Sequence, residues 1–308
     1  MFRYSDINDV SVTHFPISTN ICGQDPFEVN KMLIENKTMD EERALYGSSD
    51  ITVKNCRFDG PADGESALKE SSNVTVLNSY FNLRYPLWHV RRLNISSSEM
   101  TGNCRAAIWY SDQINIRDTK LHGIKAIREC EHVLITTSSI ISPEFGWSVK
   151  YFGMSDTTVE SEYFLMRSSD IIIKNLTLKG KYSFQYVENC EISNSVLSTK
   201  DAFWHAKNVN IKNSVINGEY LGWYSENMTL TNCTIKGTQP FCYCKNLNLV
   251  NCRMEECDRA FERSHVNAEI TTPVLSIKNP LSGKITVPAV GEIIRDIPGA
   301  NGEVIVKL

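Results

Sequence analysis

The sequence predicts an all-β fold, a parallel β-helix of about twelve coils. The first observation is a column of apolar residues that recurs at intervals of 19 to 23 residues. We call it the reference column: Ile34, Val53, Val76, Ile95, Ile116, Ile135, Met154, Ile173, Ile192, Ile211, Leu230 and Leu249. The columns two residues before it and five residues after it are also apolar, and helical spacing is absent from the repeats. Coils of this length, built from short alternating stretches, are typical of a parallel β-helix.

Polar residues at the turns are the further observation. The column two residues after the reference column is mainly Asn, Asp, Ser and Thr, and the column three residues before it contains Asn189, Asn208 and Asn227. Asn tolerates the left-handed backbone of turns, and stacked amides hydrogen-bond to one another. We therefore expect Asn ladders from coil to coil. Leucine-rich repeats have a similar period, but their regular LxxLxLxxN pattern is missing.

The repeats define three parts of the chain. Residues 32–260 form the predicted β-helix. Residues 1–31, which contain DPFEVNKML, are interpreted as an N-terminal cap, and residues 261–308 as a last degenerate coil followed by a C-terminal β cap. Both assignments follow because a β-helix must cover its open ends or stack on another chain.

Composition excludes several classes of partner. The 308 residues carry a net charge of −4, so there is no basic footprint for nucleic acid. No apolar run approaches the roughly 18 residues of a membrane-spanning helix. The first residues show no charged-then-apolar signal segment, which predicts a cytoplasmic protein. No cofactor is indicated.

The ten cysteines are interpreted as reduced core residues. Cys56, Cys233 and Cys252 share one column with several serines, which indicates a position for a small side chain. The stretch CYCKNLNLVNCRMEEC lacks the usual ligand spacing of a zinc site between Cys242 and Cys244. We therefore predict packed thiols and no metal.

All five tryptophans lie seven positions before the reference column. We call this the Trp column. Because adjacent side chains of a strand point to opposite faces, and the column eight positions before is apolar, we expect the indoles on the outer face of a sheet. The small residues nine positions before, such as Ala107 and Ala202, are expected on the same outer face, as a shelf beside the rings.

Two functions compete for this strip. In the first, the strip binds a saccharide, whose C–H faces stack on indoles while charged groups bind hydroxyls. The predicted binding residues are Trp88, His89, Arg105, Trp109, Lys125, Arg128, Trp147, Trp204, His205, Trp223 and Tyr224. In the second, the protein is a structural or interaction protein, and the strip is covered by its own caps, by a partner or by another protomer of a homo-oligomer.

Catalysis of glycoside cleavage would need two carboxylates, about 5–5.5 Å or 6.5–9.5 Å apart. The candidate catalytic residues near the strip, for a hydrolase or a lyase, are Glu65, Lys69, Glu70, Lys200, Asp201 and Glu219. Asp201 and Glu219 are in neighbouring coils but one column out of step. The alternative is that these residues are ordinary surface ion pairs. A metal-dependent enzyme is a third, weaker hypothesis.

Several motifs resemble a bacterial family of unknown function: ERALYGS, DGESALKES, RYPLWHV, RAAIWYS, STKDAFWHA, GEYLGWYSENMTLTNCTI and IKNP. The resemblance covers roughly residues 32–290. It implies a single-stranded, right-handed β-helix of the pectin-lyase-like superfamily, but it supplies no activity or catalytic residue. The polygalacturonase-type signatures NTD, GHG and RIK are absent, so the sequence does not predict a standard pectinase.

Overall fold

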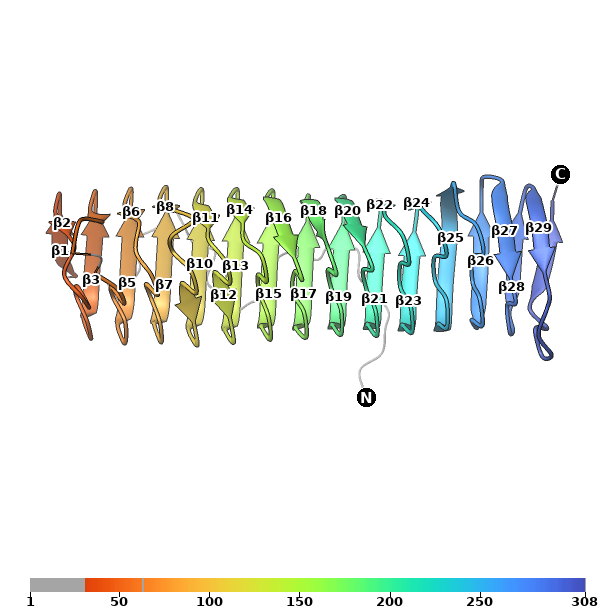
Figure 1. The fold of residues 1–308 in the computed structure, drawn as a ribbon, viewed down its shortest axis with the longest axis horizontal. Coiled ribbons are helices and arrows are strands. Elements are labelled where there is room, and N and C mark those ends of the chain that lie inside the picture. The colour runs from red at the N-terminus through yellow and green to blue at the C-terminus, as the bar shows by residue number, and fades with distance from the viewer. Residues whose placement is uncertain (1–30, 63, 308) are drawn as a thin grey trace, which may run out of the picture.

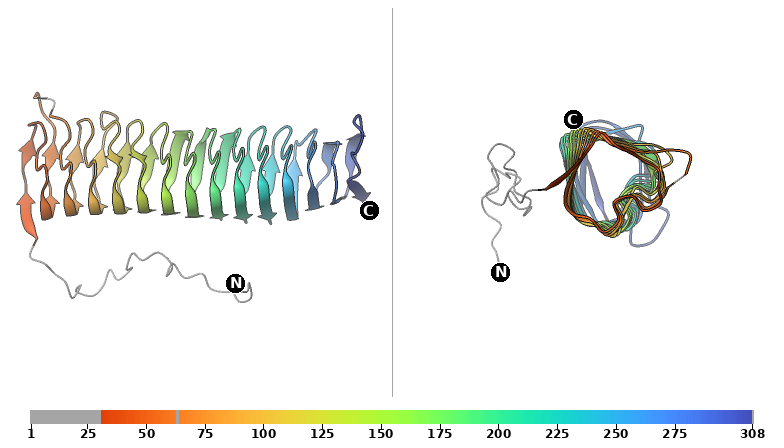
Figure 2. Two further views of the ribbon diagram at one scale, coloured as in Figure 1. Left: turned by 90° about the horizontal axis from the view of Figure 1, so that it is seen from below. Right: turned by 90° about the vertical axis from the view of Figure 1, so that its left-hand side faces the viewer.

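The computed structural model describes residues 31–62 and 64–307, which form an elongated parallel β-helix (Figures 1 and 2). Viewed down the long axis, the coils superpose around a single core (Figure 2). The described residues are strands, turns and irregular backbone, and they contain no helix that is long and apolar enough to cross a membrane. The predicted N-terminal cap, apart from Lys31, lies outside the described residues.

The first sheet contains one strand from every coil, and all neighbouring strands pair in parallel. Its strands are β1 (Met32–Glu35), β3 (Ser49–Lys54), β5 (Ser72–Leu77), β7 (Arg91–Ser96), β10 (Asp112–Arg117), β13 (Glu131–Thr136), β15 (Lys150–Ser155), β17 (Ser169–Lys174), β19 (Glu188–Ser193), β21 (Lys207–Lys212), β23 (Glu226–Thr231), β25 (Lys245–Glu255), β26 (Val266–Ile270), β28 (Lys284–Val287) and β30 (Glu303–Val306).

The second sheet is made of shorter parallel strands, and the long strand β25 joins it to the first. Its other strands are β2 (Thr38–Met39), β4 (Arg57–Phe58), β6 (Tyr80–Phe81), β8 (Glu99–Met100), β11 (Lys120–His122), β14 (Ser139–Ile141), β16 (Thr158–Glu162), β18 (Thr177–Lys181), β20 (Val196–Lys200), β22 (Val215–Asn217) and β24 (Thr234–Lys236). Two further pairs are β9 (Ile108–Trp109) with β12 (Ile127–Arg128), and β27 (Val274–Lys278) with β29 (Val290–Ile294).

The register confirms the reference column. Ile192 pairs with Ile211, which lies opposite Leu230 in the next coil. The stack is longer than the twelve repeats that the spacing predicts, because the first sheet has fifteen strands separated by fourteen turns. Beyond Leu249 the column continues through Ala268, Ile285 and Val304, with steps of 19, 17 and 19 residues. The Asn and Trp columns end before these last coils, so the coils are difficult to recognise from the sequence.

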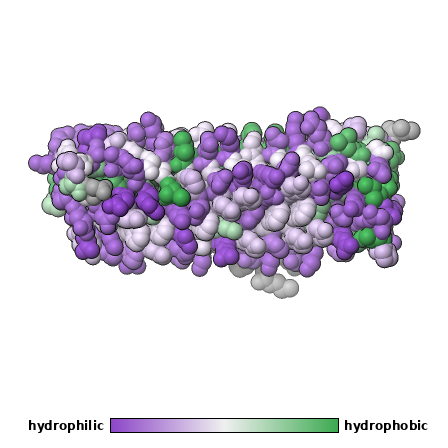
Figure 3. Space-filling model, viewed as in Figure 1, coloured by the Kyte–Doolittle hydropathy of each residue, from purple (hydrophilic) through white to green (hydrophobic). Residues whose placement is uncertain are grey.

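The core is a continuous column of buried aliphatic and phenylalanine side chains. Nine of the largest fully buried side chains are Phe, and rings from neighbouring coils stack, as Phe184 and Phe203 do at 4.8 Å between centroids. Burial of such side chains is the main favourable term in folding. The outside is mostly hydrophilic on the face shown in Figure 3, with apolar side chains gathered toward the C-terminal end.

The remaining side of most coils is a tight turn rather than a strand. We call it the turn segment. In one coil it spans residues 201–205, where Asp201, Phe203 and His205 all have a φ between 53° and 60°. Left-handed backbone at alternate non-glycine residues is costly, and coil-to-coil bonds offset that cost. The Phe203 N–H, for example, donates to the Ser183 carbonyl at 3.0 Å.

Candidate functional site

The Trp column lies in these turn segments, and not on the outer face of a sheet as the sequence predicted. Only Trp109 belongs to a strand, the two-residue β9. The small residues nine positions before the reference column were expected to share the outer face with the indoles, but Ala107 and Ala202 are fully buried. The prediction was wrong because it assumed strand alternation. The residue between the two columns, such as Phe203, has a left-handed backbone. As a result, Phe203 and the small residue before it, Ala202, both point toward the core.

Each indole is half-buried, and its N–H donates to a backbone carbonyl of the following coil. The pairs are Trp88 with Ala106, Trp109 with Lys125 (2.6 Å), Trp147 with Tyr163 (2.8 Å), Trp204 with Tyr220 (2.7 Å) and Trp223 with Gln239 (2.8 Å). Gln185, in the same column, makes the equivalent bond from its amide to the Asp201 carbonyl at 2.8 Å. The column therefore supplies an N–H donor that ties one coil to the next.

The indole faces are also in use. Trp88 and Trp109 stack at 5.2 Å, and Trp204 and Trp223 stack at 5.4 Å. The Arg128 guanidinium lies 5.2 Å from the ring centroids of both Trp109 and Trp147. A sugar that stacks on an aromatic ring needs an open ring face. Each indole therefore has at least one of its two faces covered by a ring or a guanidinium of a neighbouring coil.

An exposed ladder of rings follows the Trp column by one residue. Tyr186, His205, Tyr224 and Tyr243 stack in successive coils with centroid distances of 4.7 to 5.0 Å. Tyr186 and Tyr224 remain nearly half exposed. We call these four residues the ring ladder. It contains His205 and Tyr224, two of the predicted binding residues, but each of these rings is stacked between two others.

The candidate catalytic residues fall into two separate groups. In the first, Glu65 pairs with Arg84 at 3.4 Å, Glu70 with His89 at 3.4 Å, and the Lys69 ammonium lies 5.2 Å from the Trp88 ring centroid. These side chains are partly exposed. Ion pairs of this kind contribute little to stability and do not by themselves indicate catalysis.

The second group brings Lys200, Asp201 and Glu219 together, and their charges influence one another. Lys200 Nζ lies 2.9 Å from Glu219 Oε2, and this hydrogen bond raises the lysine pKa. Burial raises the pKa of Asp201. Six coil-to-coil steps separate this group from His89, which is about 29 Å at 4.8 Å per step. The two groups cannot act on one bond.

Two other predicted binding residues lie apart from any pocket that we describe. Arg105 is exposed, and Lys125 Nζ pairs with Glu144 Oε2 at 3.3 Å. The structure instead has a hollow on the first sheet, away from the Trp column.

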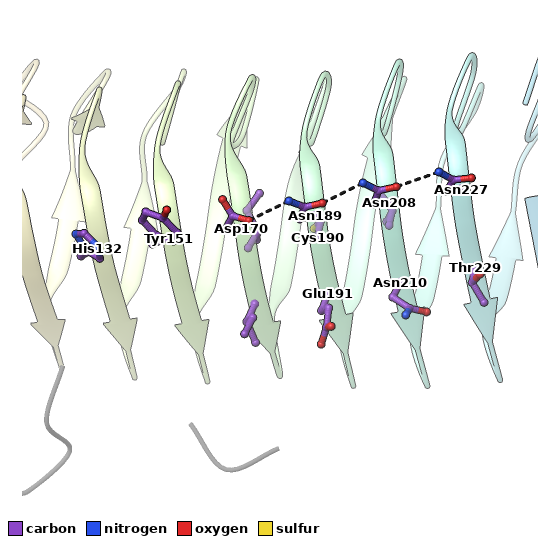
Figure 4. Close-up of a pocket in the computed structure, with 13 residues that line it drawn as sticks. His132, Tyr151, Asp170, Asn189, Cys190, Glu191, Asn208, Asn210, Asn227 and Thr229 are labelled. Atoms are coloured by element: carbon purple, nitrogen blue, oxygen red, sulfur yellow. Dashed lines mark hydrogen bonds between the residues drawn. The ribbon is translucent and has the colours of Figure 1, made fainter. Parts of the chain in front are cut away.

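This hollow is a groove of about 780 Å³ that crosses strands β13, β15, β17, β19, β21 and β23 (Figure 4). We call it the axial groove. Five coil-to-coil steps give it a length of roughly 24 Å along the helix axis. Two rows of outward side chains border it. The upper row in Figure 4 is His132, Tyr151, Asp170, Asn189, Asn208 and Asn227, and the lower row contains Glu191, Asn210 and Thr229. Ile172 belongs to the lower row, because it pairs with Glu191 in the neighbouring strand.

The upper row is the predicted Asn ladder. Asn227 donates to Asn208, Asn208 to Asn189 and Asn189 to the carboxylate of Asp170, each at 3.0 Å (Figure 4). All three residues have a φ between 55° and 57°. Each amide uses one N–H and one lone pair in the ladder, which leaves one N–H and one lone pair for a ligand in every coil.

One end of the axial groove carries a different group. His132 Nδ1 lies 2.8 Å from Asp112 Oδ1, and the His132 ring stacks on Tyr151 at 4.8 Å. The sequence analysis did not predict His132, Tyr151 and Glu191 as site residues, because they lie on the first sheet and not in the Trp column. A signal was present, since a histidine and a tyrosine interrupt the polar column that Asp170 and its asparagines continue.

The fold and the axial groove define an elongated parallel β-helix with an outward-facing groove that polar side chains border. Residues 32–305 match the family described as Protein of unknown function (DUF3737), and the chain belongs to that family. The membership predicted from the sequence motifs is thereby confirmed. No curated protein matches the chain.

Several solved structures are similar to this chain in the path of the backbone. The surface adhesin PfbA of Streptococcus pneumoniae is 12% identical, with 72% of this chain and 71% of that chain covered and a TM-score of 0.36. The A-module of the mannuronan C-5 epimerase AlgE4 of Azotobacter vinelandii is 10% identical, with 84% and 91% covered and a TM-score of 0.32. A double mutant of the periplasmic alginate epimerase AlgG is 12% identical, with 85% and 79% covered and a TM-score of 0.31. At these scores the similarities say nothing about a ligand.

Proposed function

We propose that the protein binds a neutral saccharide chain lengthwise in the axial groove. The observation that carries this proposal is the periodic array of amide groups in the upper row, which offers a donor and an acceptor in each of three successive coils. Saccharide hydroxyls both donate and accept hydrogen bonds. An elongated array therefore suits an elongated, hydroxyl-rich ligand.

The charges of the axial groove favour a neutral chain over an acidic one. Its charged lining groups are the carboxylates of Asp170 and Glu191, and neither Lys nor Arg is among the described residues that line it. Lys174 and Lys212 border a smaller adjoining hollow of about 140 Å³, on the far side of Glu191. A polyanion entering the groove would meet like charges and lose hydration without gaining a cationic partner.

An extended peptide is a poorer occupant. Peptides bind β-proteins mainly by adding a strand to an unpaired sheet edge. The strands under the axial groove are central, and each pairs with a neighbour on both sides, as β19 does with β17 and β21. Their backbone donors and acceptors are already satisfied, so recognition must come from side chains.

The experiment is binding of neutral and acidic polysaccharides on a glycan array, followed by calorimetry with the best ligand. Asn210→Trp places a bulky ring in the lower row and should weaken binding at least tenfold, which is about 1.4 kcal/mol. Asn217→Trp is the matched control, because Asn217 is an exposed asparagine of the same coil on β22. Failure of every saccharide to bind, or equal loss in both variants, would contradict the proposal.

A second candidate function, docking of a partner protein or a second copy, is favoured by the ring ladder. Its nearly half-exposed tyrosines form an aromatic surface, and the Arg167 guanidinium lies 5.8 Å from the Tyr186 ring centroid, a combination that is typical of interaction sites. Sedimentation of the purified protein tests self-association. Tyr224→Glu should shift an oligomer toward monomer, and a wild-type protein that sediments as a monomer at all concentrations would exclude the homo-oligomer.

A further inference from the structure

In the outward column four positions before the reference column, charged residues of neighbouring strands carry opposite signs, with one exception. From Glu188 onward its signs alternate, with Glu188 opposite Lys207 and Lys207 opposite Glu226 in neighbouring strands. Earlier, Arg91 lies opposite Asp112 and Glu131 opposite Lys150. Within the described part of this column, Asp112 and Glu131 are the one pair of charged neighbours that carry the same sign. Like charges directly opposite each other are destabilising, so this pair is unusual.

A histidine lies at this same point. His132 follows Glu131 in β13, and its Nδ1 is 2.8 Å from Asp112 Oδ1. One ligand atom from each of Asp112, Glu131 and His132 lies within 4.8 Å of the others. Lys150 Nζ forms an ion pair with Glu131 Oε1 at 3.9 Å, which is too long for a hydrogen bond, so the lone pairs of that carboxylate can still bind an ion.

We propose that Asp112, Glu131 and His132 bind one divalent transition-metal ion of the Zn²⁺ type. An imidazole nitrogen with two carboxylates suits such ions, whereas Mg²⁺ prefers oxygen ligands alone. Two neighbouring ligands about 2.1 Å from one ion are roughly 3.0–3.4 Å apart, close to the separation of Nδ1 and Oδ1 here. The ion would take the place of the hydrogen bond between His132 and Asp112 and offset the negative charges of the two carboxylates.

The surroundings hold these ligands in place. Tyr151 stacks on the His132 ring with an interplanar angle of 11°, and Gln113 Nε2 lies 3.4 Å from Asp112 Oδ2. Such supporting contacts orient metal ligands. Three protein ligands also leave an open coordination position, and His132 lines the end of the axial groove. Metal binding itself does not depend on the proposed saccharide function.

The test is calorimetric titration of the metal-free full chain with Zn²⁺ in the absence of any saccharide. We expect one ion per chain, and binding weakened at least tenfold in both His132→Ala and Asp112→Asn. Co²⁺ provides a second readout, because its visible absorption reports nitrogen and oxygen ligation and should be lost in His132→Ala. Mg²⁺ should bind much more weakly than Zn²⁺.

Two control variants separate this site from adventitious binding. His205→Ala removes an exposed imidazole of the ring ladder, and Glu188→Gln removes a carboxylate of the same outward column. Both should bind Zn²⁺ as the wild type does. No Zn²⁺ binding by the wild type, or undiminished binding by a folded Asp112→Asn variant, would overturn the proposal. Loss of Zn²⁺ binding without loss of saccharide binding would leave the proposed function intact.

Discussion

At the scale of single residues, the role of a tryptophan here is set by its N–H group. Trp204 spans two coils, because its indole donates to the Tyr220 carbonyl at 2.7 Å while its ring stacks on Trp223. Gln185 makes the same type of bond without an aromatic ring. The hydrogen bond is therefore the shared requirement of the column, and the ring adds stacking area.

We predict that Trp204→Phe lowers the free energy of unfolding by about 1–3 kcal/mol, because a partly buried carbonyl loses its donor. Urea unfolding measures this change. Tyr224→Phe is the matched control, since it keeps an exposed ring and removes only a hydroxyl, and we expect a change within about 0.5 kcal/mol. Equal losses in the two variants would refute the bridging role. Saccharide binding in the axial groove should be unchanged in both.

Asp201 is a residue that we expect to destabilise the fold at neutral pH. It is buried, its pKa is raised by burial, and its φ is 53°. A carboxyl whose pKa is raised in the folded state favours folding at low pH and opposes it once the unfolded group ionises. Asn is neutral and tolerates left-handed backbone. We predict that Asp201→Asn is stabilising by on the order of 1 kcal/mol at neutral pH.

Thermal unfolding of Asp201→Asn and wild type at two pH values checks this prediction. The gain should shrink when the pH falls below the ordinary aspartate range, since both proteins then carry a neutral group. A destabilised variant at neutral pH would indicate that the Asp201 charge is needed, for example by its neighbour Lys200.

At the scale of elements, the turns rather than the strands distinguish this coil. Asn208 combines two tasks, with a φ of 55° and ladder bonds of 3.0 Å to Asn189 and from Asn227. The aligned amides all donate in the same direction and end on the Asp170 carboxylate. An anion at that end is the favourable termination for a row of aligned N–H dipoles.

We predict that Asn208→Ala costs about 1–2 kcal/mol of unfolding free energy, because alanine both breaks the ladder and resists left-handed backbone. Asn208→Gly removes the ladder but accepts the backbone, so its cost should be smaller. The difference between the two, measured by urea unfolding, isolates the backbone contribution. Identical costs would show that the ladder alone matters.

At the scale of the whole molecule, the core is continuous and contains many thiols. The nine cysteines that the structure describes are all buried and unpaired, as the column analysis predicted. Burial raises the pKa of Cys130, Cys242 and Cys257 to about 12. Neutral thiols are poor nucleophiles. We expect these groups to react with a disulfide reagent only after unfolding.

Stability should consequently fall at high pH. An unfolded thiol ionises near its ordinary pKa of 9.0, whereas Cys130 in the folded chain does so at about 12. Between these values the unfolded state holds fewer protons, so each such thiol lowers the unfolding free energy by about 1.4 kcal/mol per pH unit. Cys130→Ala should have a shallower decline by that amount between pH 9 and 11. Parallel pH profiles for variant and wild type would contradict the assignment.

Much of the fold was predictable from spacing. The register of Ile192, Ile211 and Leu230 followed from their separation of 19 residues. The C-terminal coils were predicted only as one degenerate coil and a β cap, because their columns through Ala268 and Ile285 lack the asparagines that mark a coil. Periodicity also does not determine whether the β-helix is right- or left-handed, and the predicted right-handedness came from the family resemblance alone.

The candidate site was less predictable. Residues of one column, such as Trp204 and Trp223, were correctly placed in neighbouring coils, and so were Asp201 and Glu219. The orientation of the Trp column was predicted wrongly, because its indoles are half-buried in turn segments and not on the outer face of a sheet. Strand alternation does not hold across left-handed residues, so a column number in a turn segment does not say which way a side chain points.

The sequence by itself determined the repeat, the register, the Asn ladders and the packing of the thiols. These depend on identical side chains that recur at the same position of every coil, and stacking turns that recurrence directly into contact. Only the tertiary structure decided that indoles of neighbouring coils stack on one another, that the groove crosses the first sheet, and that His132 meets Asp112 across two strands. Those outcomes depend on backbone direction at the turns and on charges from different coils, which no single repeat contains.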